Sequence, residues 1–391
     1  MPWKESSTMD QKEFLIKDWL TGSYTITDLA AEYGVTRPTI YKVIQRFEEF
    51  GKRGFLELSR APHTIPHKTP EKIEALIIEE RHRKEYGGRK IVKILRKRYP
   101  RLRLPGISTA NDILDRHGLL QKKRRRRRNR PTKPILNPQA PNDVWCTDYK
   151  GEFKMGSRIY CYPLTISDQY SRFLIGIKAL TSPNLKDSKK YYIKVFKKYG
   201  LPLQILSDNG SPFAAASALG RLSRLSVWWI KQGIAPVLTQ PGHPEQNGIH
   251  ERMHRELKKK TTKPSAYNLS GQQRKFNEFI EEYNNVRPHE SLNDDIPSSF
   301  YTSSEREYTD RIKGPEYPSH FEVRYVSKNG GMKWNNRHVG VSTCLETEYI
   351  GLDEFDDGMW KVYFYDRKIG YLDERKMRIF DNDGRYKRNL V

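Results

Sequence analysis

The stretch Asp143–Phe153, DVWCTDYKGEF, contains a short apolar run that is followed by an acidic residue, Asp148. Similar β-rich runs come after it: RIYCYPLTISDQY, RFLIGIKALT and, beyond the helix-like stretch LKDSKKYYIKVFKKYG, the run LQILSD. Short runs rich in β-branched and aromatic residues are typical of strands. Three strands in succession, followed by alternating helix and strand, predict a mixed sheet with helices on its faces.

Two further carboxylates occupy comparable positions. Asp208 ends the run LQILSD and is followed by Asn209-Gly210, a turn signal that would leave its side chain at the sheet edge. Glu251 begins a basic helix in PGHPEQNGIHERMHRELKKK, residues 241–260. Three carboxylates from different elements suit a pair of Mg²⁺ ions, which activate a water or hydroxyl and stabilise the leaving oxygen of a phosphodiester. Asp148, Asp208 and Glu251 are therefore the candidate catalytic and metal-binding residues.

The same helix allows a different interpretation, because His250 to His254 reads H-E-x-x-H. On a helix this pattern is typical of zinc proteases, in which both histidines bind the metal and Glu251 activates water. Glu278 would be a third ligand. The flanking RELKKK run is highly charged and does not suit the lining of a peptide-binding cleft, so this interpretation is the less favoured one.

Helical geometry favours a nucleic-acid site instead. Glu251, Arg255 and Lys258 follow the spacing i, i+4 and i+7, which puts two cations beside the metal site where phosphates would lie. His243 and Gln246, in the preceding loop, are candidate DNA contacts. The two histidines of the H-E-x-x-H pattern would then either contact DNA or pack.

Charge supports a polyanionic partner. The 391 residues include 71 Lys and Arg against 47 Asp and Glu, a net charge of +24, which makes nucleic acid the first candidate and an anionic membrane surface the second. No run approaches the ~18 apolar residues of a membrane span, and the start MPWKESSTMDQ has no signal-peptide core. We expect a cytoplasmic protein, associated with the nucleoid in a bacterial host. The cysteines Cys146, Cys161 and Cys344 are too few for a disulfide framework and are expected to be reduced and buried.

The N-terminal part has the pattern of a helix-turn-helix. In TITDLAAEYGVTRPTIYKVIQRFEEFG a first helix over 27–32 precedes a turn at Gly34, and a recognition helix would begin near Arg37 and Thr39, which could reach base edges. An ordinary helical hairpin is the alternative. Beyond a proline-rich linker, residues 73–120 offer three more helical segments that resemble a second such unit.

Two other segments complete the organisation. Residues 122–133, KKRRRRRNRPTK, are expected to form a basic tether that contacts phosphates along the DNA backbone. Arg124, Arg125 and Arg126 are among the residues that would make these contacts. Short strand-like runs between His320 and Ile379, separated by Gly, Asn and Asp turns, predict a small β-barrel.

The chain resembles insertion-sequence transposases of the DDE group, whose catalytic core is shared with retroviral integrases. The motifs that carry the resemblance stand in family order over 141–292: VWCTDYKGEF, TISDQYSRFLIG, ILSDNGSPF, LSRLSVWWIKQGI, PGHPEQNGIHERMHRELKK and EYNNVRPHESL. The resemblance implies a ribonuclease-H-like core in which Asp148, Asp208 and Glu251 are the catalytic triad. It also implies Mg²⁺ as cofactor, with Mn²⁺ as a substitute, and a homo-oligomer acting on element ends and target DNA.

Two features depart from the family pattern. Between Asp208 and Glu251 lie 42 residues, more than the usual spacing of about thirty-five, although insertions into surface connections cost little. The paired His and Cys of the integrase zinc-binding domain are absent from the N-terminal region, and helix-turn-helix units stand there instead. The second feature favours bacterial-type transposases over viral integrases.

The sequence thus predicts a multidomain α and α/β protein. Its segments are a helix-turn-helix domain over 1–58, a second helical DNA-binding domain over 59–121, a basic linker over 122–140, a ribonuclease-H-like mixed-sheet core over 141–305 and a C-terminal β-barrel over 306–391. The predicted function is a transposase that cuts and joins DNA. A DNA-binding regulator without catalysis is the alternative besides the zinc protease, since helix-turn-helix units alone would suffice for repression.

Overall fold

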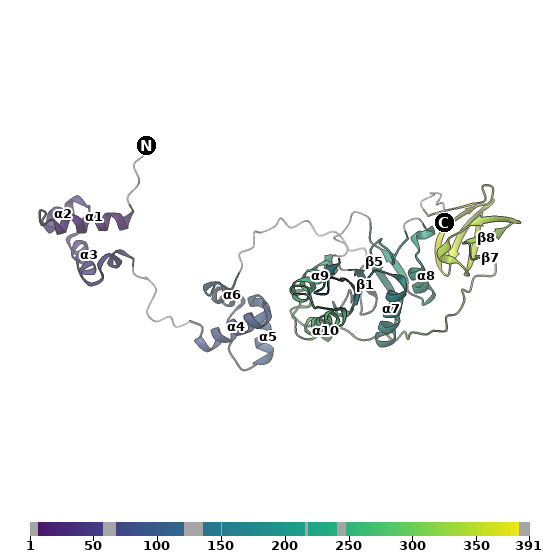
Figure 1. Ribbon diagram of the computed structural model, residues 1–391, viewed down its shortest axis with the longest axis horizontal. Helices are drawn as coiled ribbons and strands as arrows, with labels where there is room; N and C mark the ends of the chain where they lie inside the picture. The colour runs from purple at the N-terminus through teal and green to yellow at the C-terminus, as the bar shows by residue number, and fades with distance from the viewer. Residues whose placement is uncertain are drawn as a thin grey trace. The chain divides into compact units, whose positions relative to one another are not determined.

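The computed structural model describes residues 7–57, 68–120, 136–149, 151–215, 218–240 and 248–382. The chain folds as two compact units, Met1–Pro70 and Glu71–Val391 (Figure 1). The described residues include no helix long and apolar enough to cross a membrane.

The first unit is a three-helix domain. Helices α1 (Thr8–Leu20), α2 (Ile26–Glu32) and α3 (Arg37–Phe50) surround a small core, and a short 3₁₀ turn, Gly51–Phe55, closes it. Capping boxes begin the first two helices, with Ser7 paired to Asp10 and Thr25 to Asp28. The predicted first helix, turn and recognition helix are all present.

The second unit begins with three helices, α4 (Glu71–Lys84), α5 (Gly88–Arg98) and α6 (Ile107–Arg116), around their own apolar cluster. The connection between α5 and α6, residues 99–106, is longer than the three- or four-residue turn of a helix-turn-helix motif.

A mixed sheet follows, as predicted. Its strands are β1 (Val144–Tyr149), β2 (Phe153–Lys154), β3 (Tyr160–Asp168), β4 (Leu174–Leu180), β5 (Gln204–Ser207) and β6 (Ala235–Leu238). The order is β2-β3-β1-β5-β6, with β4 pairing β3. Strand β3 runs antiparallel to its three neighbours, whereas β1, β5 and β6 are parallel. The parallel strands bring the ends of β1 and β5 to one edge of the sheet.

Helices cover both faces of this sheet (Figure 1). On one face, α7 (Leu185–Tyr199) and α8 (Arg224–Lys231) contribute Tyr192, Phe196, Trp228 and Trp229 to a cluster that includes Trp145. Trp228 and Trp229 are buried core residues. On the other face, α9 (Gly248–Thr261) and α10 (Leu269–Asn285) pack apolar side chains against β3 and β4.

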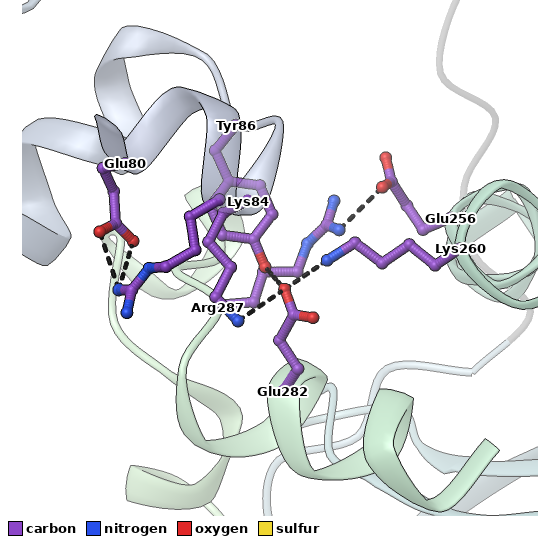
Figure 2. Close-up of polar contacts among 8 residues, drawn as sticks. Glu80, Lys84, Tyr86, Glu256, Lys260, Glu282 and Arg287 are labelled. Carbon is purple, nitrogen blue, oxygen red and sulfur yellow. Dashed lines mark hydrogen bonds and ion pairs between the residues drawn. The ribbon is translucent and has the colours of Figure 1, made fainter. Parts of the chain in front are cut away.

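The three-helix segment α4–α6 contacts α9 and α10 through a polar cluster (Figure 2). The Tyr86 hydroxyl donates to Glu282 Oε1 at 2.5 Å, and Lys84 and Lys260 both pair with that carboxylate. Nearby, Arg287 Nη1 donates to Glu256 Oε2 at 2.8 Å. These contacts join residues distant in sequence, so the packing of the helical segment on the core depends on tertiary structure.

The C-terminal region forms open sheets, so the predicted β-barrel is not confirmed. The strand order is β13 (Arg378–Phe380), β12 (Arg367–Asp373), β11 (Met359–Phe364), β10 (Tyr349–Asp356) and β7 (Glu322–Tyr325), with a separate hairpin of β8 (Gly331–Trp334) and β9 (Arg337–Gly340). No backbone pairing joins β7 to β13 among the described residues. Leu219, Leu222 and two α8 residues, Val227 and Ile230, share the apolar core of these strands.

All three cysteines are unpaired. Cys146 and Cys161 are buried as expected, and burial raises the pKa of each thiol to about 12. Cys344 is only half-buried, contrary to expectation, because it lies at the edge of the C-terminal core.

Candidate functional site

The first two candidate carboxylates belong to neighbouring strands of the sheet. Strands β1 and β5 are parallel, with Cys146 opposite Leu206. Asp148 lies two residues further along β1, and Asp208 directly follows Ser207, the last residue of β5. Neighbouring strands are ~4.8 Å apart and parallel strands end at the same edge of a sheet, so both acids belong to that edge.

A tight turn fixes Asp208. The Gly210 amide donates to Asp208 Oδ1 at 3.1 Å, and the Asn209 side-chain amide donates to the Thr239 carbonyl at 2.8 Å. Arg221 Nη1 donates to Asn209 Oδ1 at 3.3 Å, which ties this turn to the segment before α8. A Cβ atom on Gly210 would lie 3.1 Å from Asp208 Oδ2. The sequence analysis identified Asn209-Gly210 as a turn but not the contribution of Arg221, which lies 12 positions after Asn209 and carries no local signal.

Asp148 is held from the neighbouring strand and from α9. Thr165 is its antiparallel partner on β3, and the Thr165 hydroxyl donates to the Asp148 carbonyl at 2.9 Å. His254 approaches from α9, with Nδ1 at 3.7 Å from Asp148 Oδ2. The carboxylate therefore lies between the sheet and the helix that carries Glu251.

The two histidines of the H-E-x-x-H pattern face the sheet. His250 and His254 are buried, with 1% and 5% of their surface exposed. The His250 ring lies 2.7 Å from the Thr165 hydroxyl and 2.9 Å from that of Ser167, and His254 Nε2 lies 2.7 Å from the Thr165 hydroxyl. Burial lowers the pKa of His250 to about 3, so its ring is neutral at pH 7. Of the two roles left open, packing is the one observed.

The zinc-protease interpretation is not favoured by this arrangement. Both nitrogens of His250 lie at hydrogen-bond distance from hydroxyl groups, which leaves none for a metal. Glu278 is an exposed residue of α10. No group of three or more His, Cys, Asp or Glu side chains that could hold a metal occurs in the part of the chain that the structure describes.

Glu251 lies in the first turn of α9 and is exposed. Arg255 and Lys258, on the same helix face, are exposed too, whereas Met253 and Leu257 are buried against the sheet. The helix therefore presents one acidic and two basic side chains outward.

The residues fit a magnesium ion in part. Asp148 and Asp208 carry carboxylate oxygens, the ligand type that Mg²⁺ prefers, and both belong to the same edge of the sheet. Glu251 lies on α9, the helix whose His254 contacts Asp148. The described residues do not gather the three carboxylates into one group.

The remaining predicted residues fall into two groups. Arg37 and Thr39 lie exposed in the first turn of α3, as a recognition helix requires. Arg124, Arg125, Arg126, His243 and Gln246 lie outside the described residues.

Asp168, another acid at the end of a strand, is a turn residue and not part of the candidate site. It is 1% exposed and accepts hydrogen bonds from the Asn142 amide and from the amide and hydroxyl of Ser171.

Known families match both units of this chain. Residues 138–244 match a family described as Integrase core domain, and residues 232–297 match a second family with the same description. Together the two matches span residues 138–297. Residues 11–63 match a Helix-turn-helix domain. The resemblance to insertion-sequence transposases with an integrase-like core is confirmed.

Curated relatives include the uncharacterized 31.7 kDa protein of insertion element IS407 from Burkholderia multivorans, 25% identical over 193 residues, which are 47% of this chain and 64% of the relative. The Gag-Pol polyprotein of Koala retrovirus is 28% identical over 123 residues, 32% of this chain and 7% of the polyprotein. The chain therefore spans less than two thirds of the length of these relatives.

Two solved structures are among those that this chain matches. The HTLV-2 integrase catalytic core domain in complex with magnesium, in its dimeric form, has 14% identity and a TM-score of 0.31, covering 42% of this chain and 97% of its own. The simian T-cell lymphotropic virus intasome in complex with PP2A regulatory subunit B56 gamma has 13% identity and a TM-score of 0.37, and the match covers 74% of this chain and 96% of the matched chain.

Proposed function

We propose that this protein is a DNA transposase, which binds the ends of a mobile element, cleaves phosphodiester bonds there and joins the freed 3′-hydroxyl ends to target DNA. The observation that carries the proposal is the position of Asp148 on β1 and of Asp208 directly after the parallel strand β5, in residues that match an integrase core. The +24 charge and the helix-turn-helix domain supply the affinity for DNA that such a reaction requires.

In this proposal Asp148 and Asp208 hold one Mg²⁺ ion together, and Glu251 helps to hold a second, with Mn²⁺ as a substitute. The metal pair would supply an activated water or hydroxyl and stabilise the leaving oxygen. His254 acts as a positioning residue, since its ring lies against the Asp148 carboxylate. His250 anchors α9 to the sheet through Thr165 and Ser167, which sets the place from which Glu251 acts.

DNA would be held by several parts of the chain. Arg255 and Lys258 extend from the exposed face of α9 beside Glu251, where scissile phosphates would lie. Arg37 and Thr39 would contact base edges at the element's end. The basic run that includes Arg124 would contact backbone phosphates, which carry no sequence information. We further propose a homo-oligomer on DNA, because two ends must be joined to one target, and a cytoplasmic location at the nucleoid. His243 and Gln246 are proposed DNA contacts in the loop before α9.

The decisive experiment compares four variants in a strand-transfer assay with Mg²⁺: Asp148→Asn, Asp208→Asn, Glu251→Gln and the double change His250→Ala with His254→Ala. We expect each carboxylate variant to lose about three orders of magnitude or more in transfer while DNA binding survives, because each change removes a metal ligand. Near-normal transfer by Asp208→Asn would refute the assignment. Specific DNA binding without any transfer by the unaltered protein would support the regulator instead.

A further inference from the structure

A second polar site lies beside α9. A cavity of about 290 Å³ is enclosed by α9, α5, the β3–β4 connection and the segment after α10. One water occupies ≈30 Å³ of liquid, so this cavity has room for a larger group. The side chains that line it and carry chemistry are Lys90, Arg172, Arg252, Glu256, Arg287 and His289.

Three buried nitrogen atoms among these side chains have no hydrogen-bond partner in the described part of the chain. They are Nη1 of Arg172, Nε of Arg287 and Nε2 of His289. Arg287 is only 8% exposed, so water does not compensate freely for the missing partner. Buried polar groups are almost always hydrogen-bonded, and an unmet donor costs free energy. Burial lowers the pKa of His289 to about 3, and its ring donates to the Tyr283 backbone, so His289 is neutral and its Nε2 atom is an acceptor. The two guanidinium N–H groups are unmet donors at one cavity, which indicates a site for an acceptor-rich ligand.

The charges around the cavity favour an anion. Four cations line it, Lys90, Arg172, Arg252 and Arg287, against the two carboxylates Glu256 and Glu290, an excess of two positive charges.

Both carboxylates already have partners. Glu256 accepts from Arg287 Nη1 at 2.8 Å, as Figure 2 shows, and Glu290 accepts from Arg89 Nη1 at 2.9 Å. Burial, followed by the charge of Arg287, lowers the pKa of Lys90 to about 8. The cations are therefore crowded and incompletely neutralised.

We infer that this cavity binds a phosphate group of the DNA backbone, held by Arg172 and Arg287. The inference rests on the proposed function and extends it to a phosphate site that the motif spacing did not indicate. A guanidinium offers donors in a planar fork that matches phosphate oxygens. Gly248 lines the cavity at the first residue of α9, and Arg252 lies next to Glu251 in the chain, so the bound phosphate lies near the start of the helix that carries the third carboxylate.

The test measures binding of a random-sequence DNA duplex by fluorescence anisotropy at several salt concentrations, using the full chain. We expect Arg172→Met to weaken binding about tenfold and to reduce the slope of log affinity against log salt by about one, as loss of one phosphate contact requires. Arg274→Met is the matched control, because Arg274 is an exposed residue of α10 that does not line the cavity, and it should change neither quantity.

A second variant distinguishes loss of a DNA contact from loss of folding. Arg252 is exposed at the cavity rim, so Arg252→Met should keep the thermal midpoint of the unaltered protein and still weaken duplex binding. Unchanged affinity and unchanged salt slope in both Arg172→Met and Arg252→Met would overturn the inference.

Inorganic phosphate at fixed ionic strength separates a site for DNA from a site for the free anion. If phosphate raises the thermal midpoint of the unaltered protein but not of Arg172→Met, while both bind the duplex equally, the cavity takes a free anion and the DNA assignment fails. The carboxylate variant Asp148→Asn distinguishes the two proposals. If it transfers strands normally while Arg172→Met still weakens duplex binding, the proposed catalysis fails and the phosphate site stands.

Discussion

His254 lies on helix α9 with its Nδ1 atom 3.7 Å from the Oδ2 atom of Asp148 on strand β1. The contact joins a histidine of the H-E-x-x-H pattern to the first candidate carboxylate, across 106 positions of the chain. A pair of histidines one helical turn apart can face a metal or a sheet equally well. Here both rings face the sheet, and the glutamate between them points outward from it.

The first prediction concerns His254. We expect His254→Ala to reduce strand transfer about tenfold, far less than Asp148→Asn, because the histidine positions the carboxylate and does not itself hold the metal. His254→Asn, which keeps a polar side chain toward Asp148, should restore part of the loss. Transfer rates at several Mg²⁺ concentrations provide the measurement. A zinc ion bound at one per chain and lost with His254→Ala would contradict this role.

The second prediction concerns pH and His250. Its folded pKa of about 3 lies below the unfolded value of about 6.5, so the unfolded chain binds the proton more readily. The contribution of neutral His250 to the free energy of unfolding is complete above about pH 6.5 and declines as the pH falls toward 3. Between pH 7 and pH 5 we expect a loss of about 2 kcal/mol.

Chemical denaturation at several pH values measures this loss. The variant His250→Asn should be less stable at pH 7 but should show a shallower decline on acidification. Part of the decline remains, because burial also lowers the pKa of His289 to about 3. An identical slope in His250→Asn and the unaltered protein would show that His250 is not the group that titrates.

The third prediction concerns Gly210. A methyl group there would lie 3.1 Å from Asp208 Oδ2, so Gly210→Ala should displace the carboxylate by a few tenths of an ångström. We expect strand transfer to fall about tenfold with DNA affinity unchanged, since small misplacements at a reacting centre are costly. Gly151→Ala is the control, because a Cβ atom there meets nothing within 4 Å. Equal activity of the two variants would mean that the Asp208 turn tolerates the shift.

The fourth prediction separates sequence reading from phosphate contact. Arg37, exposed at the start of α3, should contact base edges, so Arg37→Ala should reduce the preference for the element's end over random DNA. Replacing Arg124 to Arg128 with glutamine should instead weaken binding to all sequences and flatten the salt dependence. Competition binding at two salt concentrations measures both effects. Equal weakening of specific and random DNA by Arg37→Ala would place the recognition surface elsewhere.

The sequence determined those features that depend on near neighbours in the chain. Apolar runs followed by Asp148 and Asp208 predicted strands and the acids at their ends, and the mixed sheet is present. The capping residue Thr25 and the turn at Gly34 specified the helix-turn-helix through hydrogen bonds that span only a few residues. Such signals are local, so a single sequence suffices to find them.

Only the tertiary structure decided what depends on distant partners. The histidines at 250 and 254 pack because Thr165 and Ser167, more than eighty positions earlier, present hydroxyl groups to them. The C-terminal sheet shares its apolar core with Val227 and Ile230 of α8, more than ninety positions before its first strand. Arg172 and Arg287 line one cavity because the β3–β4 connection and the end of α10 meet beside α9. Each of these outcomes follows from burial and charge contributed by segments that are remote in the sequence, and no local pattern encodes which segments will meet.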